Sequence, residues 1–133
     1  MPRGPLPAEL VEFLRPARPA VVATVRPDGT PVTTATWYDW DDGRLLLSMT
    51  AGSPRTRNVR ANPGVALTVL GEDWYDHVSV SGPVVELRED EGLADLDRLS
   101  RRYWGEPYPK RELRCVTALV EVERWHSWGE AGR

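Results

Sequence analysis

The sequence predicts a mainly β protein, a small closed antiparallel β-barrel of six strands decorated with three short helices. The strands it predicts follow one another through tight turns, which gives an antiparallel meander and not a βαβ unit. A Gly82-Pro83 pair interrupts the longest β-rich run, as at a barrel corner. The 133 residues fit one domain, residues 1–133, which is long enough to bury its own core.

The elements are expected in the following order: a helix over 7–14, strands over 20–26, 31–40 and 44–50, a helix over 54–61, strands over 65–70 and 75–87, a helix over 89–105, and a strand over 114–125. In the first helix Leu10 and Leu14 fall on one side, and Pro16 ends it. The turn PDGT, with Gly29 free to adopt positive φ, makes residues 20–40 a hairpin. A second turn over 41–43 leads into the third strand.

The later elements have clear boundaries as well. Ser53 followed by Pro54 is typical of a helix start, with Ser at the N-cap and Pro at the first helical position. In the third helix leucines recur at helical spacing, acids crowd the start and arginines the end, in keeping with the helix dipole. In the last strand Val116, Ala118 and Val120 share one face.

The composition narrows the class of protein. Hydrophobic residues make up 41% and charged residues 28%, and the formal net charge is −3. We expect a globular protein whose main partner is not nucleic acid, because the chain has no extended basic face. No apolar run approaches a membrane span, which needs about 20 residues. Cys115 is the single cysteine, which excludes an internal disulfide and fits a cytoplasmic location. Six tryptophans suit a core, a pocket or an interface.

Most familiar catalytic and metal signatures are missing. The sequence has neither a P-loop nor a G-x-G-x-x-G turn after a strand. His77, His126 and Cys115 do not stand at zinc-site spacing, so no metal site is expected, and Cys115 is expected to be a buried, inert thiol. Asp39, Asp41 and Asp42 are interpreted as solvated acids that flank a turn. No catalytic residue is identified.

The acid-free segment TAGSPRTRNVRANPG, residues 50–64, carries three arginines in an acidic protein. A helix N-terminus offers unpaired N–H groups that favour a bound phosphate, and Arg55 adds a bidentate fork next to the Thr50 and Ser53 hydroxyls. A surface helix with solvated arginines explains the segment equally well. The strand Val32–Trp37 favours a ligand site, because its small hydroxylated side chains suit a flat polar ring.

The stretch VVATVRPDGTPVTTATWYDWDDGRLLLSMTAGSPRTRNVRANPGVALTV, with RYWGEPY and the ending VERWHSWG, resembles the pyridoxamine 5'-phosphate oxidase-like flavoproteins. It is most similar to the branch that uses the deazaflavin coenzyme F420. The resemblance runs from about Leu6 to Gly129 and implies a split β-barrel, a homodimer, and two cofactor sites at the dimer interface.

The resemblance also implies a set of cofactor-binding residues. Arg55 stands where the family usually has a lysine that binds phosphate, and Trp104 and Tyr108 help cover the bound ring. The strand, loop and helix positions that match the family's cofactor site are Val32, Thr33, Thr34, Ala35, Thr36, Ser48, Met49, Thr50, Ala51, Gly52, Arg55, Arg57 and Asn58.

Three functions remain open from the sequence. The first is an oxidoreductase in which F420 transfers hydride to a small unsaturated or aromatic molecule. The second is an FMN-dependent oxidase or reductase, and the third is a non-catalytic protein that binds a flavin, a deazaflavin or haem. The substrate and any proton donor are not identified by the sequence.

Overall fold

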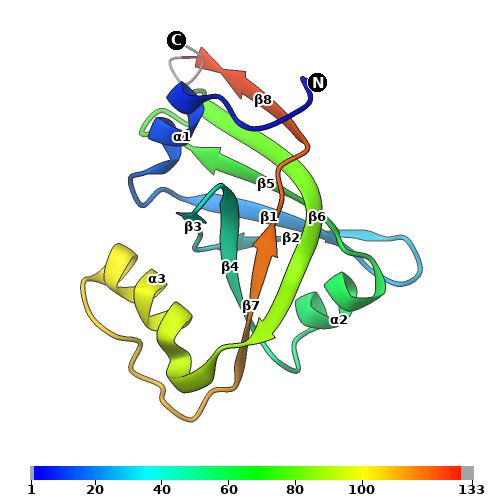
Figure 1. The fold of residues 1–133 in the computed structure, drawn as a ribbon, viewed down its shortest axis with the longest axis vertical. Coiled ribbons are helices and arrows are strands. Elements are labelled where there is room, and N and C mark those ends of the chain that lie inside the picture. Colours follow the sequence, from blue (N-terminus) through cyan, green and yellow to red (C-terminus); the bar gives the residue numbers. More distant parts are fainter. Residues whose placement is uncertain (1, 130–133) are drawn as a thin grey trace.

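The structure, a computed structural model that describes residues 2–129, is mainly antiparallel β with three α-helices (Figure 1). The expected domain over residues 1–133 extends past the described residues at both ends. The elements are α1 (Ala8–Leu14), β1 (Ala20–Val25), β2 (Pro31–Thr36), β3 (Asp39–Asp41), β4 (Arg44–Thr50), α2 (Pro54–Ala61), β5 (Gly64–Leu70), β6 (His77–Glu89), the 3₁₀ turn η1 (Glu91–Leu93), α3 (Ala94–Trp104), β7 (Cys115–Val120) and β8 (Arg124–Trp128).

The strands are hydrogen-bonded in the order β2-β1-β5-β6-β7-β4-β3, and β8 pairs with β6 beside this path. Every pairing is antiparallel. The expectation of six strands in a closed barrel is therefore wrong on two points, although the fold class holds. The described residues form eight strands, because two expected strands are each divided, and the sheet stays open between β2 and β3.

The first division separates β2 from β3, within the expected strand over 31–40. Tyr38 is fully buried there, and its hydroxyl donates to the carbonyl oxygens of Leu14 at 2.9 Å and Pro16 at 3.0 Å. The chain therefore leaves the β1–β2 ladder after Thr36 to place this ring in the core. It then resumes as β3, paired with β4 through a two-residue turn in which Asp42 and Gly43 both have positive φ.

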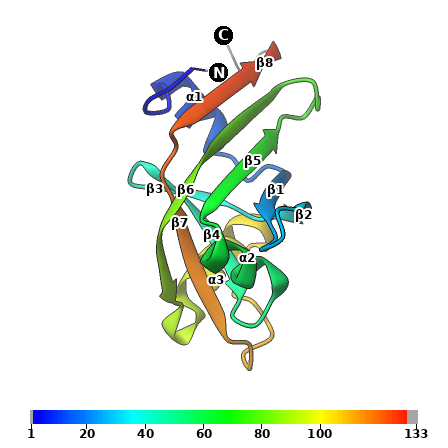
Figure 2. The same ribbon diagram turned by 90° about the vertical axis from the view of Figure 1, so that its right-hand side faces the viewer.

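The second division separates β7 from β8, within the expected strand over 114–125. It lies beside a bend in β6, which the Gly82-Pro83 pair predicts. The first half of β6 pairs with β5 and β8, the second half pairs with β7, and a register shift falls between Val84 and Glu86. A Cβ at Gly82 would collide with the carbonyl oxygen of Glu121, because the segment 121–123 crosses the bend at backbone contact. This crossing separates β7 from β8 (Figure 2).

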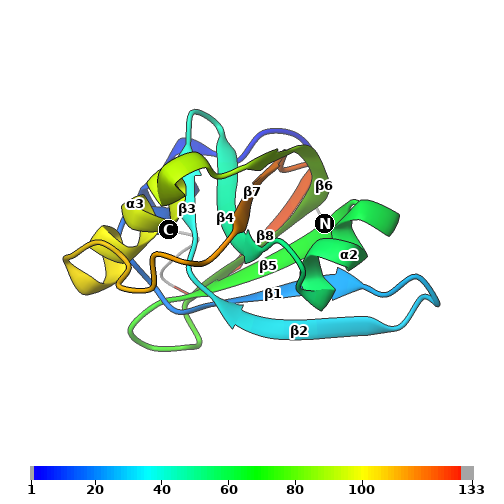
Figure 3. The same cartoon turned by 90° about the horizontal axis from the view of Figure 1, so that it is seen from below.

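All six residues of β7 are buried, and its neighbour β4 is buried over Leu45–Leu47 and at Met49. Leu45, Leu47 and Met49 of β4 face the main core, which also takes in Leu10 and Leu14 of α1. The opposite face meets α3, where Leu46 and Leu119 pack with Leu99. The helices α2 and α3 lie on either side of β4 (Figure 3). Within residues 2–129, none of the helices combines the length and the apolar character needed to cross a lipid bilayer.

Candidate functional site

A cavity of about 660 Å³ lies between α3, the strands β2 and β4, and the first turn of α2. This volume falls within the range of small-molecule sites in proteins. The cavity lies on the face of β4 that points away from the main core. Leu47 and Met49 point into the core, so Ser48 and Thr50 point into the cavity, because side chains alternate along a strand. Its two ends differ in chemistry.

The α2 end of the cavity is polar. The hydroxyl-bearing residues Thr36, Ser48 and Thr50 line it together with Arg55. Ser53 caps α2 as expected, because its Oγ accepts a hydrogen bond from the backbone N–H of Thr56 at 3.3 Å. This cap fixes the first turn of the helix, and with it the point from which the Arg55 side chain extends toward β2.

Arg55 is a partly buried cation without a carboxylate partner among the described residues. Its Nη1 donates to Oγ1 of Thr36 at 3.4 Å, a long hydrogen bond to a neutral group. Burial lowers the pKa of the Arg55 guanidinium. Arginine nevertheless stays charged, so this end of the cavity presents positive charge that the protein itself does not neutralise.

The α3 end of the cavity is aromatic. Trp37, in the connection between β2 and β3, stacks on Tyr103 with ring centroids 5.4 Å apart, and meets Trp104 edge-on at 4.7 Å. Tyr108 lies 6.1 Å from Trp37 and 5.9 Å from Trp104, measured between ring centroids. Leu96, Leu99 and Leu113 complete this wall.

The structure brings five of the residues implied by the family resemblance to the cavity wall: Ala35, Thr36, Ser48, Thr50 and Arg55. The others lie elsewhere: Val32, Thr33 and Thr34 on β2 away from the cavity wall, Met49 in the core, Ala51 and Gly52 in the turn before α2, and Arg57 and Asn58 on α2. Arg57 donates to the carbonyl oxygen of Gly52, and the buried Asn58 donates to Oγ1 of Thr24. Their part in cofactor binding stays a prediction.

Sequence reasoning missed several wall residues. Trp104 and Tyr108 were expected near a bound ring, and both line the cavity. Trp37 ends the strand expected to meet a ligand but was not named as a site residue, and Tyr103 and Cys115 were not anticipated there. Cys115 is buried as expected, and burial raises the pKa of its thiol, which keeps it protonated and neutral. The alternation of Val116, Ala118 and Val120 toward the core was the available signal, since it turns Cys115 to the opposite face.

Two other residue groups from the sequence lie outside the cavity. His77 and His126 are neighbours on β6 and β8, with ring centroids 5.8 Å apart. Across residues 2–129, no three His, Cys, Asp or Glu side chains gather as metal ligands. The interpretation of Asp39 and Asp41 as solvated turn acids is wrong: both accept hydrogen bonds from Arg98 of α3, at 2.8 and 3.1 Å.

A sequence model of the pyridoxamine 5'-phosphate oxidase family matches residues 6–129. Among solved structures, the chain is similar to one described as an F420 reductase, with 30% identity and a TM-score of 0.80 over 95% of this chain and 98% of that one. It is also similar to a conserved hypothetical protein from Mycobacterium tuberculosis, with 27% identity and a TM-score of 0.68 over 95% and 86% of the two chains.

A haem-binding protein from Mycobacterium smegmatis shares the fold alone, with 17% identity and a TM-score of 0.65 over 96% of this chain and 57% of that one. The region matched by the family model includes every residue that lines the cavity.

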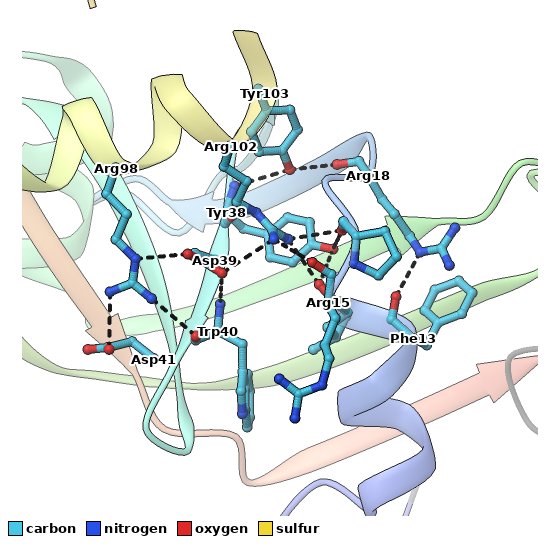
Figure 4. A network of polar contacts seen from close by, with 12 residues as sticks. Phe13, Arg15, Arg18, Tyr38, Asp39, Trp40, Asp41, Arg98, Arg102 and Tyr103 are labelled. Atoms are coloured by element: carbon cyan, nitrogen blue, oxygen red, sulfur yellow. Dashed lines mark hydrogen bonds and ion pairs between the residues drawn. The ribbon is translucent and has the colours of Figure 1, made fainter. Parts of the chain in front are cut away.

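Arg102 joins the cavity wall formed by α3 to the rest of the fold, alongside Arg98 and Tyr103 of the same helix (Figure 4). Its guanidinium donates to the carbonyl oxygens of Leu14, Arg15 and Pro16 at the end of α1, and to that of Tyr38 at 2.9 Å. It also lies 4.9 Å from the centroid of the Tyr38 ring. One side chain thus joins α1, the β2–β3 connection and α3.

Replacing Arg102 with alanine is expected to destabilise the protein, because four carbonyl oxygens would lose a charged donor. A hydrogen bond to a charged group contributes about 1.5–3 kcal/mol, so we expect a loss of about 3 kcal/mol in the free energy of unfolding. Urea denaturation measures it. The matched control is Arg101→Ala, an exposed neighbour on α3, which should change stability by less than about 0.5 kcal/mol. Equal effects from both variants would contradict this role for Arg102.

Proposed function

The chain belongs to the pyridoxamine 5'-phosphate oxidase family, a family of flavin-binding proteins and oxidoreductases, and from this premise we propose that it is an F420-dependent oxidoreductase. In this proposal the protein uses the deazaflavin coenzyme for hydride transfer to a small unsaturated or aromatic substrate. The similarity to an F420 reductase over nearly the full length of both chains supports the choice of cofactor.

The observation that carries the proposal is the unneutralised charge of Arg55. Placing a cation away from water is costly unless an anion meets it. The phosphate of a flavin or a deazaflavin provides such an anion, and the capped N-terminus of α2 adds backbone N–H groups and a favourable dipole beside it. The guanidinium fork suits a phosphate in two-pronged geometry.

The cavity residues have distinct roles in this proposal. Arg55 holds the phosphate, and Thr36, Ser48 and Thr50 offer hydroxyls to the polar edges of the ring system and its chain. The bound cofactor supplies the hydride, and the protein supplies orientation and the exclusion of water. The Tyr103 hydroxyl is already committed, because it donates to the carbonyl oxygen of Arg18 at 2.7 Å and burial raises its pKa. We therefore assign no proton donor.

Arg55→Ala should weaken cofactor binding by about 1.5–3 kcal/mol, the range for hydrogen bonds to charged groups. The Tm of the ligand-free protein should barely change, because Arg55 contributes no ion pair within the described part of the chain. Isothermal titration with F420 measures the affinity. Arg101→Ala removes an exposed arginine of α3 that does not line the cavity and is the matched control. An Arg55→Ala protein with wild-type affinity would show that the phosphate binds elsewhere.

The preference between F420 and FMN tests the identity of the cofactor. F420 continues beyond the phosphate into a tail with extra carboxylates, where FMN stops. Arg57 and Arg60 give α2 further positive charge. The Arg57 guanidinium donates a hydrogen bond to the carbonyl oxygen of Gly52, in the turn before α2. Both arginines are exposed, so their attraction for the tail should be modest and screened by salt.

We expect F420 to bind more tightly than FMN, with a difference that shrinks as the ionic strength rises. Parallel titrations of the two cofactors at low and high salt measure this. Equal or tighter binding of FMN at low salt would favour the FMN-dependent alternative. The haem-binding alternative has a separate readout, a Soret band in the visible spectrum of the purified protein.

A homodimer with the cofactor at its interface completes the proposal. The edge strand β2 pairs with β1 on one side only within residues 2–129, and most of its side chains are exposed. An unpaired, exposed edge is a surface that proteins generally cover or protect. A second copy that covers β2 would place Val32, Thr33 and Thr34 at the dimer interface, where the family resemblance puts the cofactor.

Light scattering at micromolar concentration should therefore give about twice the chain mass of 15.0 kDa. Obligate dimers bury about 2,000 Å² or more, so the dimer should persist on dilution. A folded monomer that binds the cofactor with full affinity would remove the shared site from the proposal.

A further inference from the structure

The four rings of Trp37, Tyr103, Trp104 and Tyr108 form what we call the aromatic box, at the α3 end of the cavity. The box is assembled from distant parts of the chain, because Trp37 follows β2 while the other three belong to α3 and the loop after it. Trp37 is its centre and contacts each of the other three rings.

Trp104 is unusual among these rings because it is incompletely covered. It lines the cavity, yet 58% of its surface is exposed to solvent. Among the described contacts it has ring neighbours but no hydrogen-bond partner. A large apolar surface left open at the mouth of a cavity gains free energy when a ligand covers it. This exposed ring is therefore available for contact with a ligand in the cavity.

The charge of the lining restricts what the box accepts. Among the described residues that line the cavity, Arg55 is the single charged side chain, and it belongs to the α2 end. Leu96 and Leu99 flank the box, and the described part of the cavity lining includes no carboxylate. A charged group at this end would lose its hydration without gaining a partner. Flat aromatic walls favour a ring that stacks on them or meets them edge-on.

We propose that the aromatic box is the substrate subsite, and that it selects planar, uncharged, conjugated ring systems, with Trp104 as the specificity-determining residue. This assignment deepens the proposed function and rests on it for the word substrate. The binding preference itself depends on the chain's own residues and is measurable without turnover.

The preference is tested by calorimetric titration of three probes that share a two-ring skeleton, into the full chain with and without saturating oxidised F420. 2-Naphthol is planar and uncharged, 2-naphthoate is planar and anionic, and decahydro-2-naphthol is uncharged but not planar. We expect 2-naphthol to bind at least about tenfold more tightly than either of the others. Comparable affinities for 2-naphthol and 2-naphthoate would overturn the selectivity for uncharged rings, and comparable affinities for 2-naphthol and its saturated analogue the selectivity for planarity.

Variants at the box locate the binding. Trp104→Ala should weaken 2-naphthol binding by roughly tenfold, the upper range for one aromatic contact, and Trp104→Phe should restore most of it. Because this proposal places Trp104 against the substrate, in place of the cofactor ring that the family resemblance implies, the affinity for F420 should stay within about twofold in both variants. Trp74→Ala, which removes another exposed tryptophan outside the cavity lining, is the matched control and should leave 2-naphthol binding unchanged.

Two outcomes would overturn the proposal. If Trp104→Ala and Trp104→Phe both fold and bind 2-naphthol normally, the box serves only to pack the loop after α3. If the alanine variant loses affinity for F420 instead, the box covers the cofactor ring. A chain that binds 2-naphthol through Trp104 but does not bind F420 would refute the F420 proposal and leave the selectivity of the box standing.

Discussion

The contact between Arg102 and the end of α1 joins the α3 wall of the cavity to the N-terminal part of the fold. A helix terminus leaves carbonyl oxygens without intrahelical partners, and buried carbonyls without partners are costly. Here an arginine from a distant helix donates to the carbonyls of Leu14, Arg15 and Pro16 at and just after the end of α1, together with the carbonyl of Tyr38. Because the guanidinium is planar and permanently charged, it meets several acceptors at once. The contact therefore ties α3, which forms one wall of the cavity, to the end of α1 and to the connection between β2 and β3.

The bend of β6 has a different consequence for the site. Because β6 passes from one group of strands to the other near Gly82, β7 pairs with its second half and, together with β4, packs on two faces. One face belongs to the main core, and the other holds α3 and the cavity. Residues such as Ser48 and Thr50 therefore stand on strands that the core keeps rigid. A site built on such strands positions its ligands more precisely than a site built on loops.

Local sequence signals predicted the elements well and the tertiary crossings poorly. The Ser53-Pro54 helix start and the strand Arg44–Thr50 were confirmed at their expected positions, because their determinants lie within a few residues. The breaks at Tyr38 and at 121–123 depend on partners far along the chain: the carbonyls of α1 in one case, the backbone at Gly82 in the other. The site residues show the same difference between local and long-range determinants. Neighbouring residues pointed to Arg55, whereas the stacking of Trp37 on Tyr103 needs the folded chain.

Arg55 differs from several carboxylates of the same fold, because each of those has a charged or hydrogen-bonding partner. Asp39 is met by Arg98 and lies 3.5 Å from Arg102. Arg111 holds the pKa of Asp97 below its usual range by hydrogen bonding, so that carboxylate stays ionised and paired. Asp90 accepts the backbone N–H groups of Asp95 and Leu96. Each of these charges has a partner that offsets its desolvation. Among residues 2–129, Arg55 has only the Thr36 hydroxyl as a side-chain partner, so the anion that completes its environment is expected to come from a ligand.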